Sequence, residues 1–126
     1  KHLDLEIIKK DYRCAVICPW QLPYLKGEFD LFVNAISFQE MELPIVSNYI
    51  EQVQKITTRY MLLRNSKYGK PVARDGNIGV QNAITNDQMI EMIDRFELIA
   101  RDSSLFGFEN RNVNFFSEVM CFKKIR

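Results

Sequence analysis

Residues 29–41, with the sequence FDLFVNAISFQEM, constrain the fold more than any other part of this chain. The first eight residues are almost continuously apolar, a pattern that is typical of a parallel strand covered on both faces. Polar residues, among them Ser37, Gln39 and Glu40, follow where this strand should end. Because ligands bind outside the carboxyl ends of the strands in open α/β sheets, we predict a functional site at this point.

The rest of the chain predicts an alternation of strands and helices. We expect a helix within residues 1–11, a short buried strand over 13–18, a loop over 19–27 and the central strand over 29–36. A helix should follow over 42–56, because Pro44 is tolerated in a first turn and apolar residues recur there at helical spacing. The next strand is expected over 59–64, and a long connection over 65–83.

A capping box formed by Thr85 and Gln88 predicts a further helix that extends to about Arg95. Strands are then expected over 96–102 and 115–124, joined by a turn-rich connection over 103–114. Two strands in succession indicate an antiparallel pair. The series predicts an α/β fold with a mainly parallel sheet and an antiparallel final hairpin.

Composition excludes several classes of function. The 126 residues fit a single domain, 1–126, and a net charge of +1 gives no basic surface for nucleic acid or an anionic membrane. No apolar stretch approaches the roughly 20 residues that span a bilayer. A single histidine, His2, argues against a metal site. On the expected strand the Cα atoms of Cys14 and Cys18 lie roughly 13 Å apart, which is too far for a disulfide. We therefore expect buried free thiols and a cytoplasmic location, since the cytoplasm keeps thiols reduced.

The pattern FDL-x-x-N-x-x-SF-x-EM resembles the fourth strand of class I S-adenosylmethionine-dependent methyltransferases. More narrowly, it is similar to that of bacterial sugar O-methyltransferases, and the order of elements matches over residues 13–124. The matching residues are Phe29, Asp30, Leu31, Asn34, Ser37, Phe38, Glu40 and Met41.

The resemblance implies the carboxyl-terminal part of a Rossmann-like methyltransferase sheet with helices on both faces. It also implies S-adenosylmethionine as the cofactor and a sugar or glycan hydroxyl as the substrate. The glycine-rich cofactor loop of that family is missing, because none of the five glycines forms GxGxxG between a strand and a helix. The cofactor would therefore need the missing amino-terminal half.

The resemblance also suggests roles for individual residues. Pro19 and Trp20 lie where the family places the adenine, and Asn34 and Ser37 are the other expected cofactor contacts. Glu40 is the candidate base, because transfer of a methyl group to a hydroxyl requires removal of a proton. Each assignment has a structural alternative: Trp20 packs as a hydrophobic residue, Asn34 organises a neighbouring loop, and Glu40 caps the next helix.

Three further polar residues are expected to contact the substrate. Gln39 follows the central strand, and Arg64 and Asn65 end the next strand at the same edge of the sheet. A guanidinium such as that of Arg64 binds a carboxylate or phosphate bidentately, although a solvated arginine is the commoner outcome at a strand end.

Two other functions stay open from the sequence. One is a non-catalytic α/β binding or assembly module, and the other is a class I methyltransferase with a different small-molecule substrate. In the resembling fold another strand lies beside residues 29–36. Without it we expect residues 13–18 to pair with that edge, a second copy to pair there as a homo-oligomer, or the chain to aggregate.

Overall fold

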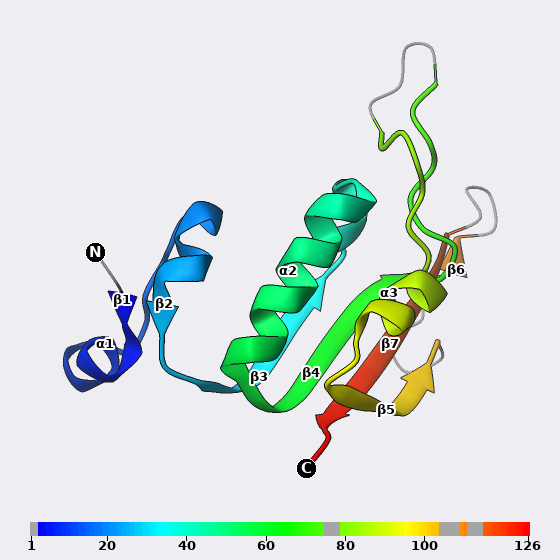
Figure 1. The fold of residues 1–126 in the computed structure, drawn as a ribbon. Coiled ribbons are helices and arrows are strands. Elements are labelled where there is room, and N and C mark those ends of the chain that lie inside the picture. The colour runs from blue at the N-terminus through cyan, green and yellow to red at the C-terminus, as the bar shows by residue number, and fades with distance from the viewer. Residues whose placement is uncertain (1–2, 75–78, 104–108, 111–114) are drawn as a thin grey trace.

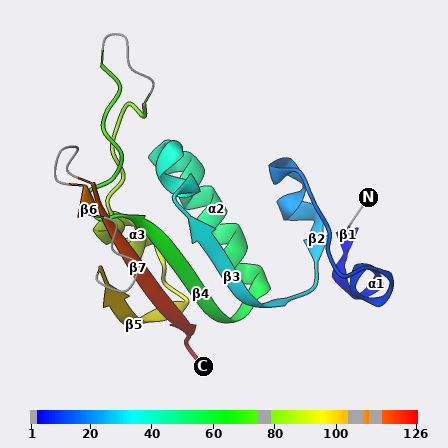
Figure 2. The same ribbon diagram turned by 180° about the vertical axis from the view of Figure 1, so that it is seen from behind.

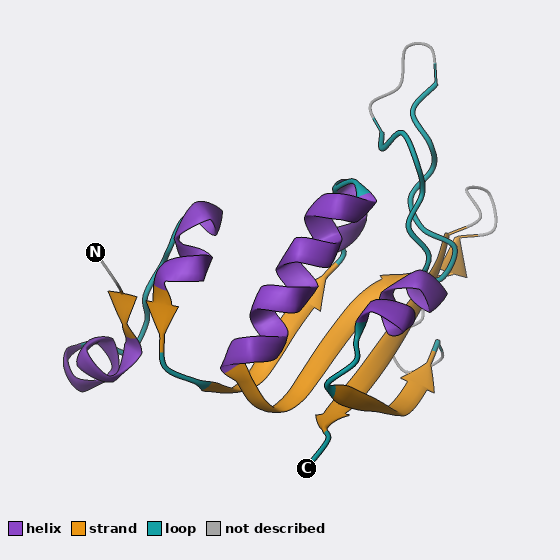
Figure 3. Ribbon diagram, in the orientation of Figure 1, coloured by secondary structure: helices purple, strands orange, loops and turns teal. Residues whose placement is uncertain are grey.

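The computed structural model describes residues 3–74, 79–103, 109–110 and 115–126 (Figure 1). Coloured by secondary structure, it shows helices alternating with strands, as the sequence predicts (Figure 3). In chain order the elements are β1 (Leu3–Asp4), α1 (Leu5–Asp11), the 3₁₀ helix η1 (Pro19–Tyr24), β2 (Leu25–Lys26), β3 (Phe29–Ala35), the 3₁₀ helix η2 (Ser37–Glu40), α2 (Leu43–Ile56), β4 (Thr57–Ser66), α3 (Asn86–Met92), β5 (Phe96–Asp102), β6 (Glu109–Asn110) and β7 (Phe115–Lys124).

The main sheet has the strand order β3-β4-β7-β5, and the short β6 pairs with β7 outside this path. β3 and β4 are parallel, whereas β7 is antiparallel to both β4 and β5. Strands β3, β4 and β5 therefore run in one direction. The predicted α/β sheet with an antiparallel end is confirmed, and β7 lies between β4 and β5.

Local sequence explains where the helices begin and end. Pro44 occupies the first turn of α2 as expected. At α3, the Gln88 N–H donates to Thr85 Oγ1 at 3.3 Å, and the Thr85 N–H donates to Gln88 Oε1 at 2.9 Å, which confirms the capping box. The helix ends at Met92, before Arg95, because the Gln54 side chain binds the Met92 carbonyl and the Arg95 N–H. No helix in the described ranges is long and apolar enough to cross a membrane.

The hydrophobic core lies between one face of the sheet and the helices α2 and α3. Both helices lie in front of the strands in Figure 1, and the strands face the viewer without a covering helix in Figure 2. We expected helices on both faces, but α2 and α3 cover the same one. The core residues from the helices and strands include Val46, Ile50, Val53, Met61, Leu63, Met89, Met120 and Phe122.

Strand β3 differs from the central, doubly covered strand that we expected. It lies at the end of the strand order, and its side chains alternate between the core and the uncovered face. Asn34 is buried on the core side, whereas Leu31 and Val33 are 51% and 55% exposed. The expectation of two covered faces is wrong for the described residues, because no second layer packs on the outer side of this apolar run.

The amino-terminal segment contains the largest error of the prediction. The strand expected over residues 13–18 does not form, because no strand of the described chain lies beside it. Cys14 and Cys18 are exposed free thiols instead of buried ones, and Val16 is 96% exposed. The loop expected over 19–27 instead contains η1 and β2, while the helix expected within residues 1–11 is confirmed by α1.

The remaining boundaries differ by smaller amounts. β4 extends beyond the expected residues 59–64, because it pairs with β7 as far as Ser66. The strands expected over 96–102 and 115–124 are confirmed by β5 and β7. Most of the connection expected over 103–114 lies outside the described residues.

Candidate functional site

The chain leaves the carboxyl end of β3 through a strained residue. Ile36 has a φ of +70°, a conformation that β-branched residues rarely adopt. Its N–H donates to the Arg64 carbonyl at 2.8 Å, and its own carbonyl accepts from the Gln39 N–H at 2.9 Å. Strained residues of this kind cluster at functional sites, so the strand end remains the candidate site.

Asn34 holds the η2 segment in place. Its Nδ2 donates to Ser37 Oγ at 2.5 Å, and its Oδ1 accepts from the Phe38 N–H at 3.4 Å. These bonds satisfy a side chain that is only 7% exposed. The Ser37 hydroxyl lies at the surface and keeps its own proton to donate to a ligand.

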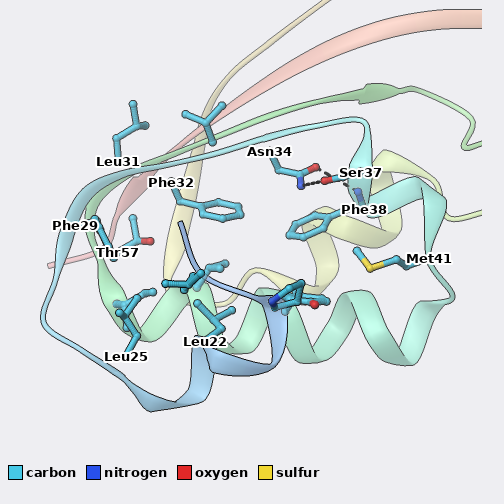
Figure 4. A pocket seen from close by; sticks show the side chains of 16 residues that line it. Leu22, Leu25, Phe29, Leu31, Phe32, Asn34, Ser37, Phe38, Met41 and Thr57 are labelled. Atoms are coloured by element: carbon cyan, nitrogen blue, oxygen red, sulfur yellow. Dashed lines mark hydrogen bonds between the residues drawn. The ribbon is translucent and has the colours of Figure 1, made fainter. Parts of the chain in front are cut away.

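A first cavity, of about 540 Å³, lies between η1, α2 and β3 (Figure 4). Asn34 and Ser37 lie at one end and Leu25 and Thr57 at the other, and the walls between are mostly apolar. This volume is within the range of small-molecule sites. Pro19 also lines this cavity, so three of the four predicted cofactor residues come together.

Trp20 does not join this group. Its side chain is 69% exposed and lines a separate cavity between η1 and α2, together with Tyr49 and Gln52. The indole is therefore neither buried in the core nor placed against Asn34 and Ser37.

A second cavity, of about 580 Å³, lies beside η2 and is bounded on another side by the connection that follows β4. Glu40 and Lys70 both line it, and their side chains form an ion pair across the cavity. Tyr68 contributes an aromatic ring, which contacts the Phe116 ring edge-on. Both charged side chains remain partly exposed, so a polar ligand can reach them.

Gln39 also lines the second cavity, but its amide group is occupied by backbone partners. Its Nε2 donates to the Ser66 carbonyl at 2.6 Å and to the Ile84 carbonyl at 3.2 Å, and its Oε1 accepts from the Ser66 N–H at 2.7 Å. The side chain is 2% exposed. Gln39 therefore ties η2 to the end of β4 and to the segment that precedes α3.

Arg64 and Asn65 line neither of these two cavities. The Arg64 Nε donates to Ser117 Oγ at 3.3 Å, on the face of the sheet that lacks helices. Asn65 is fully buried, and its Nδ2 contacts Met89 Sδ at 3.4 Å. The structure thus separates both residues from Glu40, because Arg64 and Asn65 lie within β4 instead of after its end.

The sequence interpretation missed a buried polar cluster on β7. Glu118 is 5% exposed; it accepts from Arg101 Nε at 2.9 Å and from Asn86 Nδ2 at 2.8 Å. The bond to Glu118 raises the pKa of Arg101 further above its usual range. A signal was present, because Glu118 shares the alternation of the core residues Met120 and Phe122 along β7.

No group of three His, Cys, Asp or Glu side chains suited to a metal ion occurs in the described part of the chain. The oxygen atoms Asn65 Oδ1 and Asn86 Oδ1 are buried without a hydrogen-bond partner. They lie in the cluster around Glu118, away from the two cavities.

Comparison with known proteins identifies the fold. No protein-family model and no curated protein matches the sequence. Among solved structures, magnesium protoporphyrin IX methyltransferase (ChlM) from Synechocystis PCC 6803, with bound S-adenosylmethionine, is similar at 10% identity and a TM-score of 0.58; the match covers 95% of this chain and 50% of that one.

TehB from Haemophilus influenzae is similar at 13% identity and a TM-score of 0.61, over 96% of this chain and 45% of that one. The chain thus spans about half the length of the solved structures that it matches. At these identities the likeness is one of fold: the chain resembles part of a Rossmann-like methyltransferase fold.

Proposed function

We propose that this chain forms the acceptor-binding half of an S-adenosylmethionine-dependent O-methyltransferase, and that the acceptor is a sugar or glycan hydroxyl. The observation that carries the proposal is the match of 95% of the chain to half of a methyltransferase structure with bound S-adenosylmethionine. Polar residues at the carboxyl end of β3 contribute to the walls of both cavities, which supports the proposal because ligands of open α/β sheets bind outside this end of the strands.

The first cavity fits one part of the cofactor. Asn34 and Ser37 offer an amide and a hydroxyl for its amino-acid end, while Pro19 and the neighbouring apolar wall suit its adenosine part. No carboxylate lines this cavity, and no glycine-rich turn occurs in the chain. A cofactor would take its remaining polar contacts from the half of the fold that this chain does not contain.

The second cavity supplies the group that removes a proton. When bound, the cofactor provides an electrophilic methyl group on a sulfonium. Glu40 would accept the proton of an acceptor hydroxyl that takes up this methyl group. The carboxylate of Glu40 is engaged by Lys70, so this ion pair has to open before Glu40 can bond to an acceptor hydroxyl.

A sugar matches the chemistry of the second cavity. The Tyr68 ring can pack against the C–H face of a pyranose, and Glu40 and Lys70 can bond to its hydroxyl groups. Gln39, the other substrate contact predicted at this wall, is instead engaged by the backbone of Ser66 and Ile84. Arg64 and Asn65 could contact only a methyl-accepting substrate that extends beyond this cavity.

The test is methyl transfer to a panel of glycosides by this chain joined to the remaining half of the fold. Glu40→Gln should lower turnover by about 10²–10⁴-fold and leave cofactor affinity nearly unchanged. The control is Glu51→Gln, because Glu51 also pairs with a lysine, Lys55, but on the exposed side of α2. Near-normal turnover of Glu40→Gln would remove Glu40 from the mechanism, and transfer to none of the glycosides would contradict the sugar assignment.

A second candidate function, a non-catalytic assembly module, is favoured by the open edge of β3. The same assay separates the two functions. A complete, folded domain that binds no S-adenosylmethionine would support the assembly module.

A further inference from the structure

A further cavity lies between η1 and α2, which are side by side in Figures 1 and 2. Its volume of about 390 Å³ is within the range of small-molecule sites. We call it the Trp20 groove: η1 contributes Pro19 and Trp20 to it, and α2 contributes Ile45, Asn48, Tyr49 and Gln52. None of the residues that line the groove lines the second cavity, so the groove is separate from Glu40.

Trp20 presents an indole ring that the described chain leaves uncovered. The side chain is 69% exposed, and it makes no hydrogen bond or ring contact with the described residues. Tryptophan is highly buried on average, since its ring has a large apolar area. Ile45, on the α2 side of the groove, is 49% exposed. An uncovered indole and a second exposed apolar side chain in one groove indicate a binding surface.

Two free amide groups line the same groove. Asn48 and Gln52 are four residues apart on α2, so they share one face of the helix, with Cβ atoms roughly 5–6 Å apart. Neither side chain makes a hydrogen bond with the described residues. An amide group both donates and accepts hydrogen bonds, as a hydroxyl does. No charged side chain of the described residues lines the groove, which favours a neutral ligand.

We propose that the Trp20 groove binds one sugar unit of a neutral saccharide. The C–H face of a pyranose packs on the indole ring, while the amides of Asn48 and Gln52 bond to its hydroxyl groups. This sugar unit is not the one that is methylated, and it anchors an acceptor that has more than one unit. For this use the inference rests on the proposed function, whereas binding to the groove is measured without methyl transfer.

The position of the groove suits such an anchor. Pro19, Leu22 and Tyr49 line both the groove and the first cavity, which we assign to the cofactor. A saccharide in the groove therefore lies against a wall of the cofactor cavity. Methyl transfer requires the acceptor to be held close to the cofactor, so a sugar contact at this wall has a use in the reaction.

A proline-rich peptide fits the groove less well. Such peptides dock in aromatic grooves, and Trp20 and Tyr49 offer two rings. A proline residue has no hydrogen-bond donor, however, so the amide oxygens of Asn48 and Gln52 would find no donor on its surface. The hydroxyl groups of a saccharide supply both donors and acceptors.

The fluorescence of Trp20 measures binding directly, because it is the only tryptophan of the chain. The probe is cellotriose, added to the 126-residue chain without cofactor, and the open-chain polyol sorbitol is the control. We expect half-saturation in the millimolar range. Emission should shift to shorter wavelength and acrylamide should quench it less, because the sugar covers the exposed indole. Sorbitol should leave both unchanged.

Variants of the two amides test the recognition. Asn48→Ala and Gln52→Ala should each weaken cellotriose binding about 3–10-fold, which corresponds to one hydrogen bond, and the double variant should show no response. The control is Ser47→Ala, an exposed neighbour on α2 outside the groove, which should bind like the unmodified chain. On the unmodified chain, the side-chain amide NMR signals of Asn48 and Gln52 should shift with cellotriose and not with sorbitol.

Three results would overturn the proposal: no response of Trp20 to cellotriose, an equal response to sorbitol, and unchanged affinity of the double variant. A response to decaproline or adenosine without one to cellotriose would also overturn it, because the groove would then bind a peptide or an adenine ring. Failure of the proposed reaction is distinguishable, since cellotriose would still bind at Trp20 while methyl transfer to glycosides is absent.

Discussion

Replacing Gln39 by leucine tests how η2 is held at the end of the sheet. Leucine fills a similar volume but leaves the Ser66 N–H without its acceptor and the Ile84 carbonyl without the Gln39 donor. The Ser66 carbonyl would still accept a hydrogen bond from the Gly69 N–H, at 3.2 Å. An orphaned buried group costs about 1–3 kcal/mol, so we expect a loss of about 2–4 kcal/mol in the free energy of unfolding.

Urea unfolding followed by circular dichroism measures this loss. For a chain of this size, the expected loss lowers the urea midpoint by about 1–2 M. Gln52→Leu is the matched control, because Gln52 lies on α2, is partly exposed and makes no side-chain hydrogen bond with the described residues. A Gln39→Leu protein as stable as the control would refute the structural role and favour the predicted role in substrate binding.

Two further predictions concern stability. Arg101→Met should lower the free energy of unfolding by about 2–4 kcal/mol, because it leaves Glu118 buried without its cation. Adding Glu118→Gln should recover part of that loss in the same unfolding assay. Equal losses for the single and double variants would argue against a stabilising ion pair. Thr85→Ala removes the N-cap of α3 and should lower the free energy of unfolding by about 1 kcal/mol. An unchanged urea midpoint would contradict this prediction.

Sequence patterns predicted the elements whose local signals agree with their tertiary surroundings. The α2 stripe and the Thr85–Gln88 capping box need only neighbours in the chain, and both are found in the structure. Residues 13–18 show the opposite case. Their apolar run indicated a strand, but a strand requires a partner, and none lies beside them in the described chain.

The candidate site was predictable in part. The polar end of β3 was visible in the sequence, since Ser37 and Glu40 interrupt an apolar run. The ion pair between Glu40 and Lys70 was not, because the two residues are 30 positions apart and meet only through the path of the connection after β4. The occupation of Gln39 by backbone groups likewise depends on tertiary contacts that no local pattern encodes.

The central claim, that this chain forms half of an S-adenosylmethionine site, is tested most directly by NMR titration of the 126-residue chain with S-adenosylmethionine. The account predicts weak binding, with half-saturation in the millimolar range, because each missing polar anchor costs on the order of 1–3 kcal/mol. Shifts should be confined to the amides around Asn34, Ser37 and Phe38, which lie at the polar end of the first cavity. Micromolar binding, shifts confined to other residues, or no shift at millimolar cofactor would contradict it.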